Sequence, residues 1–230
     1  MAEQLVLDLA RAEPPTFRNF VVGPNREPVA ALARLAEGAL AEPGILIWGG
    51  DGVGKTHLLH AVVAAAAPQR SAFLCARPAD VPTDADRLPA GSLVAIDDVD
   101  RAGVDEQGRL FTLYNALVAH GGQWVAAAHA PPARLGLRDD LRTRLALGLV
   151  FEVLPLSDAQ KPEALAVYAR ERGFRLGDDV IGYLLAHGRR DMPSLVATLA
   201  ALDRHSLATR RTVTVALLRE WLQRDLRLER

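Results

Sequence analysis

One glycine-rich stretch constrains the fold of this chain more than any other feature. Residues 49–56 read Gly-Gly-Asp-Gly-Val-Gly-Lys-Thr, which matches the phosphate-binding loop pattern of two spaced glycines followed by Lys and a hydroxyl residue. The stretch lies between the apolar run 45–48 and a helical pattern that begins at Leu58. Because such a loop presents backbone N–H groups at a helix N-terminus, it predicts a strand–loop–helix unit that binds phosphate. A glycine-rich turn that matches by chance is the alternative.

The residue types of this loop predict a distinct role for each part. Lys55 would reach the outer phosphates of ADP or ATP, and the Thr56 hydroxyl would coordinate Mg²⁺. The chain has 27 Lys and Arg residues, of which only Lys55 and Lys161 are lysines. In a chain that otherwise uses Arg for positive charge, Lys55 therefore supplies a compact ammonium group, which suits a crowded phosphate site. The backbone around the phosphates would come from Gly49, Gly50, Asp51, Gly52, Val53 and Gly54.

Strand and helix patterns alternate along the chain as far as Val153. Helical spacing of apolar residues is seen, for example, in Leu110, Leu113 and Leu117. The alternation predicts an α/β domain with a five-stranded parallel sheet and helices on both faces. The apolar runs that predict buried strands are 44–48, 71–76, 93–96, 124–128 and 149–153.

After Val153 the strand signals nearly stop and helical patterns remain. A capping-box pattern of Ser157 and Gln160 is expected to open a helix that runs to about Arg172. Later helices are expected over 178–187, after 191 and over 217–222. A domain boundary near Pro155 would divide the chain into an N-terminal segment (1–15), an α/β domain (16–155) and a small all-helical domain (156–230).

The strand expected over 93–96 ends in two carboxylates, Asp97 and Asp98. The end of such a strand lies beside the phosphate loop, so Asp97 is expected to complete the Mg²⁺ site with Thr56. Asp98 could orient or deprotonate an attacking water, although its side chain is one methylene shorter than that of Glu. The alternative is a strand that runs into an acidic turn with Asp100.

Composition bounds the remaining classes of function. A net charge of −1, with charges of both signs scattered along the chain, gives no overall field that would favour nucleic acid as the main partner. A single cysteine, Cys75, excludes an internal disulfide framework. With no signal-peptide pattern and no apolar run long enough to cross a membrane, the expected location is the cytoplasm.

Several motifs together resemble the AAA+ module of the bacterial replication initiator DnaA. They are the segment 16–25 (Thr-Phe-Arg-Asn-Phe-Val-Val-Gly-Pro-Asn), the phosphate loop, residues 96–98, and residues 114–117 followed by Pro131-Pro132. The likeness runs from about residue 16 to the C-terminus. It implies an AAA+ fold with a helical lid, and we expect the chain to lack the N-terminal and DNA-binding domains of DnaA. It also implies that Phe20, Val21 and Val22 line the adenine pocket.

The beginning of the chain carries a second motif, Gln4-Leu5-Val6-Leu7-Asp8-Leu9. If extended, it would present Leu5, Leu7 and Leu9 to one apolar groove, and Gln4 would add directional hydrogen bonds. The hexapeptide resembles the sliding-clamp-binding motif of the Hda family of DnaA-related regulatory inactivators, and Pro14-Pro15 would form a stiff spacer behind it. The alternative is a first strand that pairs with the domain's own sheet.

A third element is rich in arginine. The segment 137–145 places Leu137, Leu141 and Leu145 on one helical face and leaves Arg144 off that face. By resemblance, Arg144 matches the arginine finger, which reaches a γ-phosphate in another subunit and stabilises transition-state charge; Arg142 is the weaker candidate. The alternative is a solvated arginine or an ion pair with one of the acidic residues at 139 and 140.

Two positions depart from the family pattern. The sensor position on the fourth strand, acidic in DnaA-like proteins, falls on His129, whose imidazole can still donate to a phosphate. The lid sensor arginine falls on Pro193, which cannot contact phosphate and leaves Arg189 or Arg190 as substitutes. Both changes predict weak ATP hydrolysis by the chain itself.

Together with these features, the resemblance implies a negative regulator of the initiation of chromosome replication. The chain would hold ADP or ATP, dock on the DNA-loaded sliding clamp of DNA polymerase III, and use Arg144 to promote hydrolysis of the ATP bound to DnaA. DNA would be contacted indirectly through the clamp, and a homo-oligomer is compatible with the family. Two alternatives stay open: an autonomous AAA+ ATPase of the initiator or helicase-loader type acting on DNA, and a small-molecule kinase. The kinase would leave the helical domain, Arg144 and the leucine hexapeptide without a role.

Overall fold

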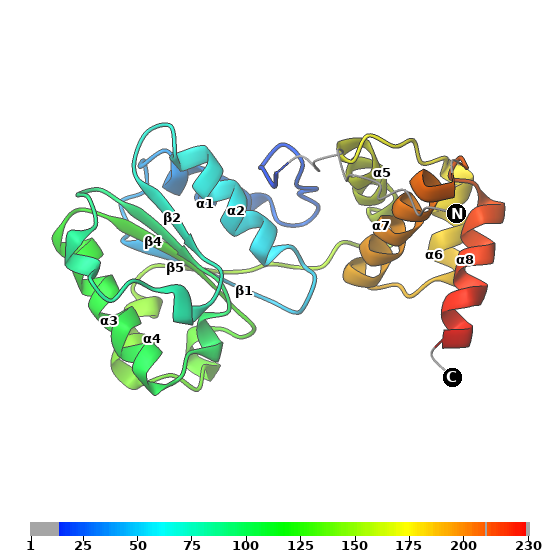
Figure 1. Cartoon of the computed structure of the whole chain (residues 1–230). Coiled ribbons are helices and arrows are strands. Elements are labelled where there is room, and N and C mark those ends of the chain that lie inside the picture. Colours follow the sequence, from blue (N-terminus) through cyan, green and yellow to red (C-terminus); the bar gives the residue numbers. More distant parts are fainter. Residues whose placement is uncertain (1–13, 210, 229–230) are drawn as a thin grey trace, which may run out of the picture. The chain divides into compact units, whose positions relative to one another are not determined.

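A parallel sheet of five strands forms the centre of the unit that spans Pro15–Pro155, and a second compact unit contains the chain from Leu156 onward. The computed structural model describes residues 14–209 and 211–228, with the backbone alone for 223–228. The strand order is β2-β3-β4-β1-β5, and all neighbouring strands are parallel (Figure 1). The strands are β1 (Gly44–Trp48), β2 (Ala72–Cys75), β3 (Leu93–Ile96), β4 (Gln123–Ala128) and β5 (Leu149–Glu152). The predicted α/β fold is confirmed, and each predicted strand differs from the observed one by at most one residue at either end.

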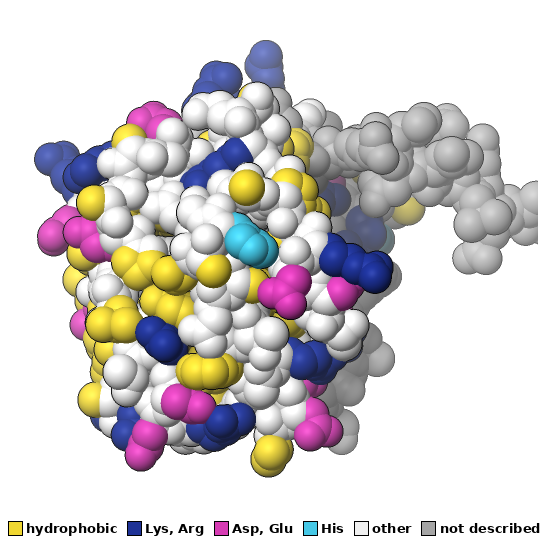
Figure 2. Space-filling view, turned by 90° about the vertical axis from the view of Figure 1, so that its left-hand side faces the viewer, with side chains coloured by type: hydrophobic (Ala, Val, Ile, Leu, Met, Phe, Trp, Pro, Cys, Tyr) yellow, Lys and Arg dark blue, Asp and Glu magenta, His cyan; other side chains and the backbone are white. Residues whose placement is uncertain are grey.

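Helices cover both faces of this sheet, as a parallel sheet requires. In Figure 1, α1 and α2 lie over one face, and α3 and α4 lie over the other. The face of the molecule seen from the left-hand side of that view carries Arg, Asp and Glu side chains interspersed with hydrophobic ones (Figure 2). The helices of this unit are α1 (Arg26–Ala36), α2 (Lys55–Ala66), α3 (Val104–Ala119) and α4 (Asp139–Ala146). Short 3-10 turns are η1 (Pro78–Asp80), η2 (Ala85–Arg87), η3 (Val99–Arg101) and η4 (Pro132–Arg134).

The central strands are apolar on both sides because successive side chains point to opposite faces. In β1, Ile45 and Ile47 pack under α1 and α2, whereas Leu46 faces α3 and α4. The same division holds in β3 and β4, so two separate apolar cores sandwich the sheet. Burying both faces fixes the register of these strands, since a slip of one residue would exchange the two sets of side chains.

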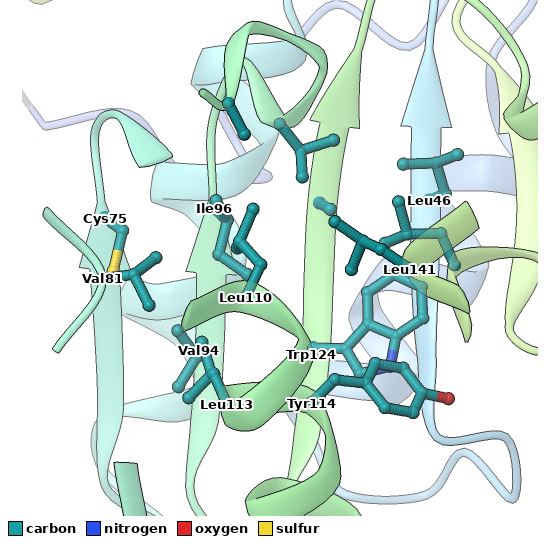
Figure 3. Packing of buried hydrophobic residues seen from close by; sticks show 14 of the residues in the cluster. Leu46, Cys75, Val81, Val94, Ile96, Leu110, Leu113, Tyr114, Trp124 and Leu141 are labelled. Atoms are coloured by element: carbon teal, nitrogen blue, oxygen red, sulfur yellow. The ribbon is translucent and has the colours of Figure 1, made fainter. Parts of the chain in front are cut away.

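The core beneath α3 and α4 is built around the largest fully buried side chain, Trp124 of β4 (Figure 3). Its indole ring lies beside Tyr114 of α3, with ring centroids 5.6 Å apart. Leu141 of α4 packs in the same cluster, so the position of α4 on the sheet depends on this core. Burial of each such leucine stabilises the unit by about 1.5–3 kcal/mol.

In its described part, the second unit consists of helices joined by turns and loops, and it has its own apolar core. Arg172 and Asp203 form an ion pair of 3.3 Å at the margin of this core, where the carboxylate is 6% exposed. Its helices are α5 (Lys161–Glu171), α6 (Asp178–His187), α7 (Met192–Thr209) and α8 (Val215–Leu228). Buried residues of this core are Leu165, Val180, Ile181, Leu184, Leu195, Leu199, Leu202, Val213, Leu217 and Leu218.

Two helix predictions in this unit need correction. The first helix begins at Lys161 and not at the predicted capping box, because a turn over 157–160 precedes it. The Gln160 side chain does accept from the Ser157 N–H at 3.0 Å, but within that turn. The last helix, α8, is longer than predicted at both ends. Among the described residues, no helix is both long enough and apolar enough to cross a lipid bilayer.

Candidate nucleotide-binding site

Three neighbouring strands bring the candidate site residues to one edge of the sheet. The phosphate loop follows β1, Asp97 follows β3 and His129 follows β4. Because β3, β4 and β1 are adjacent and parallel, their carboxyl ends meet at the same edge. The sequence separates these residues widely, and the topology alone makes them neighbours.

The phosphate loop leads directly into α2. Gly54 lies just before the helix and has a φ of +100°, a backbone conformation that residues other than glycine rarely adopt. A Cβ at this position would lie 2.7 Å from the Phe20 ring, so the close approach of that ring also requires glycine. The first N–H groups of α2 and its dipole therefore face the loop, which is the arrangement that favours a bound anion.

Lys55, the first residue of α2, is 7% exposed. Its Nζ donates to the carbonyl oxygens of Gly49 and Gly50, each at 2.8 Å. The ammonium is thus held within the loop by two backbone acceptors of that same loop. It lies where an anion bound to the loop would meet a positive charge.

Thr56 and Asp97 are brought together across the sheet edge. The Thr56 hydroxyl donates to Asp97 Oδ2 at 2.6 Å, and Asp97 Oδ1 accepts from the Asp98 N–H at 2.9 Å. Asp97 is 7% exposed, so its charge is poorly hydrated. A hydroxyl and a carboxylate in contact offer the oxygen ligands that Mg²⁺ prefers.

Asp98 has the one positive φ recorded for a residue other than glycine in the described chain, +49°. Such strained backbone is common at functional sites. Its carboxylate is 3.4 Å from Arg101 Nε, so a role as a base would have to compete with this ion pair. One ligand atom each from Asp98, Asp100 and His129 lie within 4.8 Å of one another, a spacing that a metal ion could bridge.

His129 lies between two carboxylates. Its Nδ1 is 3.0 Å from Asp100 Oδ2, and its Nε2 is 3.0 Å from Asp51 Oδ1 in the phosphate loop. Asp100 Oδ2 also accepts from the His129 backbone N–H at 3.3 Å. The sequence predicted His129 at the sensor position but no partner for it. Asp100 was expected only as part of an acidic turn.

The segment before α1 packs against the beginning of α2. The Phe20 and His57 rings lie 5.4 Å apart, and His57 Nε2 is 3.0 Å from the Thr16 carbonyl oxygen. Burial lowers the pKa of His57 below its ordinary value of 6.5, against the opposing effect of that carbonyl. Val21 and Val22, the other residues expected to line an adenine pocket, are half-buried in the same segment.

Asn25 ends the segment 16–25, and the sequence motif did not predict its contacts. Asn25 is 2% exposed, and its side chain makes two hydrogen bonds with the backbone of Leu154. Its Oδ1 accepts from the Leu154 N–H at 2.8 Å, and its Nδ2 donates to the Leu154 carbonyl at 2.9 Å. Asn25 therefore fixes the chain at the place where it leaves the α/β unit.

Arg144 lies on α4, half-buried, with its guanidinium 5.8 Å from the Phe111 ring centre and 5.7 Å from that of Tyr114. The two carboxylates considered as ion-pair partners belong to other residues. Asp139 pairs with Arg142 at 2.7 Å, and Asp140 pairs with Arg138 at 2.6 Å. Within the described part of the chain Arg144 makes no ion pair, and its guanidinium lies over the Phe111 and Tyr114 rings.

In the helical unit, Pro193 occupies the first turn of α7, where a missing N–H costs nothing. Asp191 caps that turn by accepting from the Ser194 N–H at 2.9 Å. Arg189 and Arg190 are 80% and 71% exposed, in long contacts with carboxylates of their own unit. The clamp-motif residues Gln4, Leu5, Leu7 and Leu9 lie outside the described residues.

The same fold occurs in known replication and recombination proteins. Domain III of the DnaA replication initiation protein from Thermotoga maritima superposes with a TM-score of 0.79 at 22% identity, covering 90% of this chain and 94% of that one. AMPPCP-bound DnaA from Aquifex aeolicus gives a TM-score of 0.69 at 24% identity, and the match covers 83% of this chain and 65% of that longer one. A RuvB mutant from Thermotoga maritima gives 0.69 at 16% identity, over 91% of this chain and 72% of that one.

Two family models match separate parts of the sequence. Residues 12–74, which include the phosphate loop, match the bacterial DnaA ATPase domain. Residues 158–222, which form most of the helical unit, match the lid domain of Hda. The first match covers α1, β1, the phosphate loop and α2, and the second covers α5, α6, α7 and the beginning of α8. The chain is therefore an AAA+ protein related to Hda and DnaA.

Proposed function

We propose that this chain is a nucleotide-bound regulator of replication initiation, which acts on DnaA at the DNA-loaded sliding clamp. The observation that carries the proposal is the pairing of a DnaA-type ATPase domain with a lid of the Hda type. The proposal has three components, which are a nucleotide site, an arginine finger and a clamp-binding segment.

The nucleotide site would be formed by residues 49–56, with Lys55 on the outer phosphates. Support comes from the buried ammonium, from the α2 N-terminus behind the loop, and from DnaA structures of the same fold that hold AMPPCP. Phe20, Val21 and Val22 would line the adenine pocket. ADP or ATP held there would fix the shape of the chain.

Thr56 at the beginning of α2 and Asp97 after β3 would together suit a magnesium ion. Thr56 Oγ1 and Asp97 Oδ2 would hold it, since they already lie 2.6 Å apart and are hard oxygen ligands. A bound Mg²⁺ would neutralise part of the charge of the phosphates. Asp98 would orient a water molecule near this site, in competition with its ion pair to Arg101.

The arginine finger would be Arg144. An arginine that serves another subunit must not be neutralised within its own chain, and Arg144 meets this condition because Asp139 and Asp140 pair with its neighbours. The rings of Phe111 and Tyr114 would hold the Arg144 guanidinium in place without neutralising its charge. A finger supplied in trans accelerates phosphoryl transfer by about 10³–10⁵-fold.

Docking on the clamp would use Gln4, Leu5, Leu7 and Leu9, and DNA would be reached indirectly through the clamp. The alternative, an autonomous AAA+ ATPase that grips DNA, would need a continuous basic surface. On the face shown in Figure 2, charges of both signs are interspersed. His129 and Pro193 at the two sensor positions favour weak turnover by the chain itself.

The test is hydrolysis of DnaA-bound ATP in the presence of this chain, with and without DNA-loaded clamp. The proposal expects acceleration only when the loaded clamp is present. Turnover of free ATP by this chain alone, stimulated by single-stranded DNA and independent of DnaA, would favour the autonomous ATPase instead.

A further inference from the structure

Lys55 and His129 both contact acceptors that the phosphate loop itself supplies. Lys55 donates to the carbonyls of Gly49 and Gly50, and His129 contacts the carboxylate of Asp51. Lys55 has three N–H donors and uses two of them in these bonds, whereas a phosphate that approached His129 would compete with Asp51 for Nε2. Of the loop acceptors, Asp51 alone carries a full negative charge.

The His129 ring lies between two carboxylates. Its Nδ1 is 3.0 Å from Asp100 Oδ2, and its Nε2 is 3.0 Å from Asp51 Oδ1. His129 therefore links Asp100 to the carboxylate of the phosphate loop.

Asp100 fixes the orientation of the His129 ring. It accepts from both Nδ1 and the backbone N–H of His129, which leaves Nε2 directed at the loop. Asp100 Oδ1 is buried without a hydrogen-bond partner among the described residues, so this carboxylate depends on His129 for compensation. Asp98, the other carboxylate of this cluster, is paired with Arg101.

We propose that Asp51 is an internal competitor of the nucleotide phosphate for His129, and that Asp100 is the positioning residue that holds His129 for both. Asp51 is 86% exposed, so it can swing away when a phosphate oxygen takes its place at Nε2. The cost of displacing it, and its repulsion of the phosphates, would lower the affinity of the loop for nucleotide. The inference deepens the proposed function, since it rests on nucleotide binding at residues 49–56.

The experiment is a double-mutant cycle with binding of fluorescent ADP and ATP analogues to the full chain. Asp51→Asn keeps the shape of the side chain and removes its charge, so affinity should rise by about two- to fivefold for a pair this exposed to water. In an Asp100→Asn or a His129→Gln background the gain from Asp51→Asn should shrink to the part that comes from repulsion between Asp51 and the phosphates. Asp86→Asn, an exposed carboxylate on η2, is the matched control and should leave affinity unchanged.

Thermal melting of each variant separates loss of fold from loss of the interaction. Unchanged or weaker nucleotide binding by a folded Asp51→Asn variant would overturn the inference and leave the proposed function standing. A gain of equal size in the Asp100→Asn and His129→Gln backgrounds would overturn the role of Asp100 and His129. Absence of nucleotide binding by the unaltered chain would overturn the proposed function and this inference together.

Discussion

Replacement of Asn25 with Ala should destabilise the α/β unit without touching the phosphate loop. The Asn25 side chain holds both the N–H and the carbonyl of Leu154, at 2.8 and 2.9 Å. The side chain is 2% exposed, so water cannot replace it without rearrangement. Alanine at this position removes both hydrogen bonds at once.

The size of the effect follows from these two bonds. Each contributes about 0.5–1.5 kcal/mol net, so the free energy of unfolding should fall by roughly 2 kcal/mol. In urea unfolding this corresponds to a midpoint lowered by about 1 M, with an unchanged slope. Asn115→Ala is the matched control, because the Asn115 side chain makes no hydrogen bond within the described part of the chain.

An isosteric variant sharpens the test. Asn25→Asp keeps the acceptor for the Leu154 N–H but sets a negative oxygen against the Leu154 carbonyl, whereas the protonated acid can donate to it. Asn25→Asp should therefore be less stable at neutral pH than the unaltered chain, and it should recover relative to Asn25→Ala as the pH is lowered. An Asn25→Ala midpoint equal to that of Asn115→Ala would refute the reasoning.

Further outcomes are expected at other positions. Gly54→Ala would place a Cβ 2.7 Å from the Phe20 ring at a φ of +100°, so it should abolish nucleotide binding and cost about 1–3 kcal/mol of stability; normal binding by isothermal titration would contradict this. His57 has its pKa lowered by burial from 6.5, so the unfolded chain binds the proton more readily and stability should fall as pH drops below 6.5. This dependence should flatten in His57→Gln, and an identical pH profile would count against the assignment. Replacing Leu7 and Leu9 together with Ala should abolish clamp binding in surface plasmon resonance, with nucleotide affinity unchanged; retained clamp affinity would rule out the motif.

The fold was predictable because each element carries its own local signal. The strands β1 and β3 are continuous apolar runs that end at a glycine loop or at carboxylates, so their ends were clear from the sequence. One exception, the beginning of α5, depends on a turn that competes with the capping pattern of Ser157. Local hydrogen-bond patterns of this kind have similar energies, and the sequence does not decide between them.

The candidate site was predictable only in part. That Thr56 and Asp97 meet follows from parallel strands whose carboxyl ends share an edge. The contacts of His129 with Asp51 and of Asn25 with Leu154 span 78 and 129 positions of sequence. They depend on side-chain rotamers at the ends of separate elements, for which no local pattern exists. The placement of Arg144 over Phe111 likewise depends on how α3 and α4 pack on the sheet.

The central claim is that this chain promotes hydrolysis in the nucleotide site of a partner. The most direct measurement is the single-turnover rate of hydrolysis of DnaA-bound ATP with DNA-loaded clamp and either Arg144→Ala or Arg142→Ala. The account predicts that Arg144→Ala loses the stimulation, by up to about 10³-fold, while nucleotide and clamp binding persist. Arg142→Ala, which removes an arginine already paired with Asp139, should retain it. Full stimulation by Arg144→Ala would contradict the account.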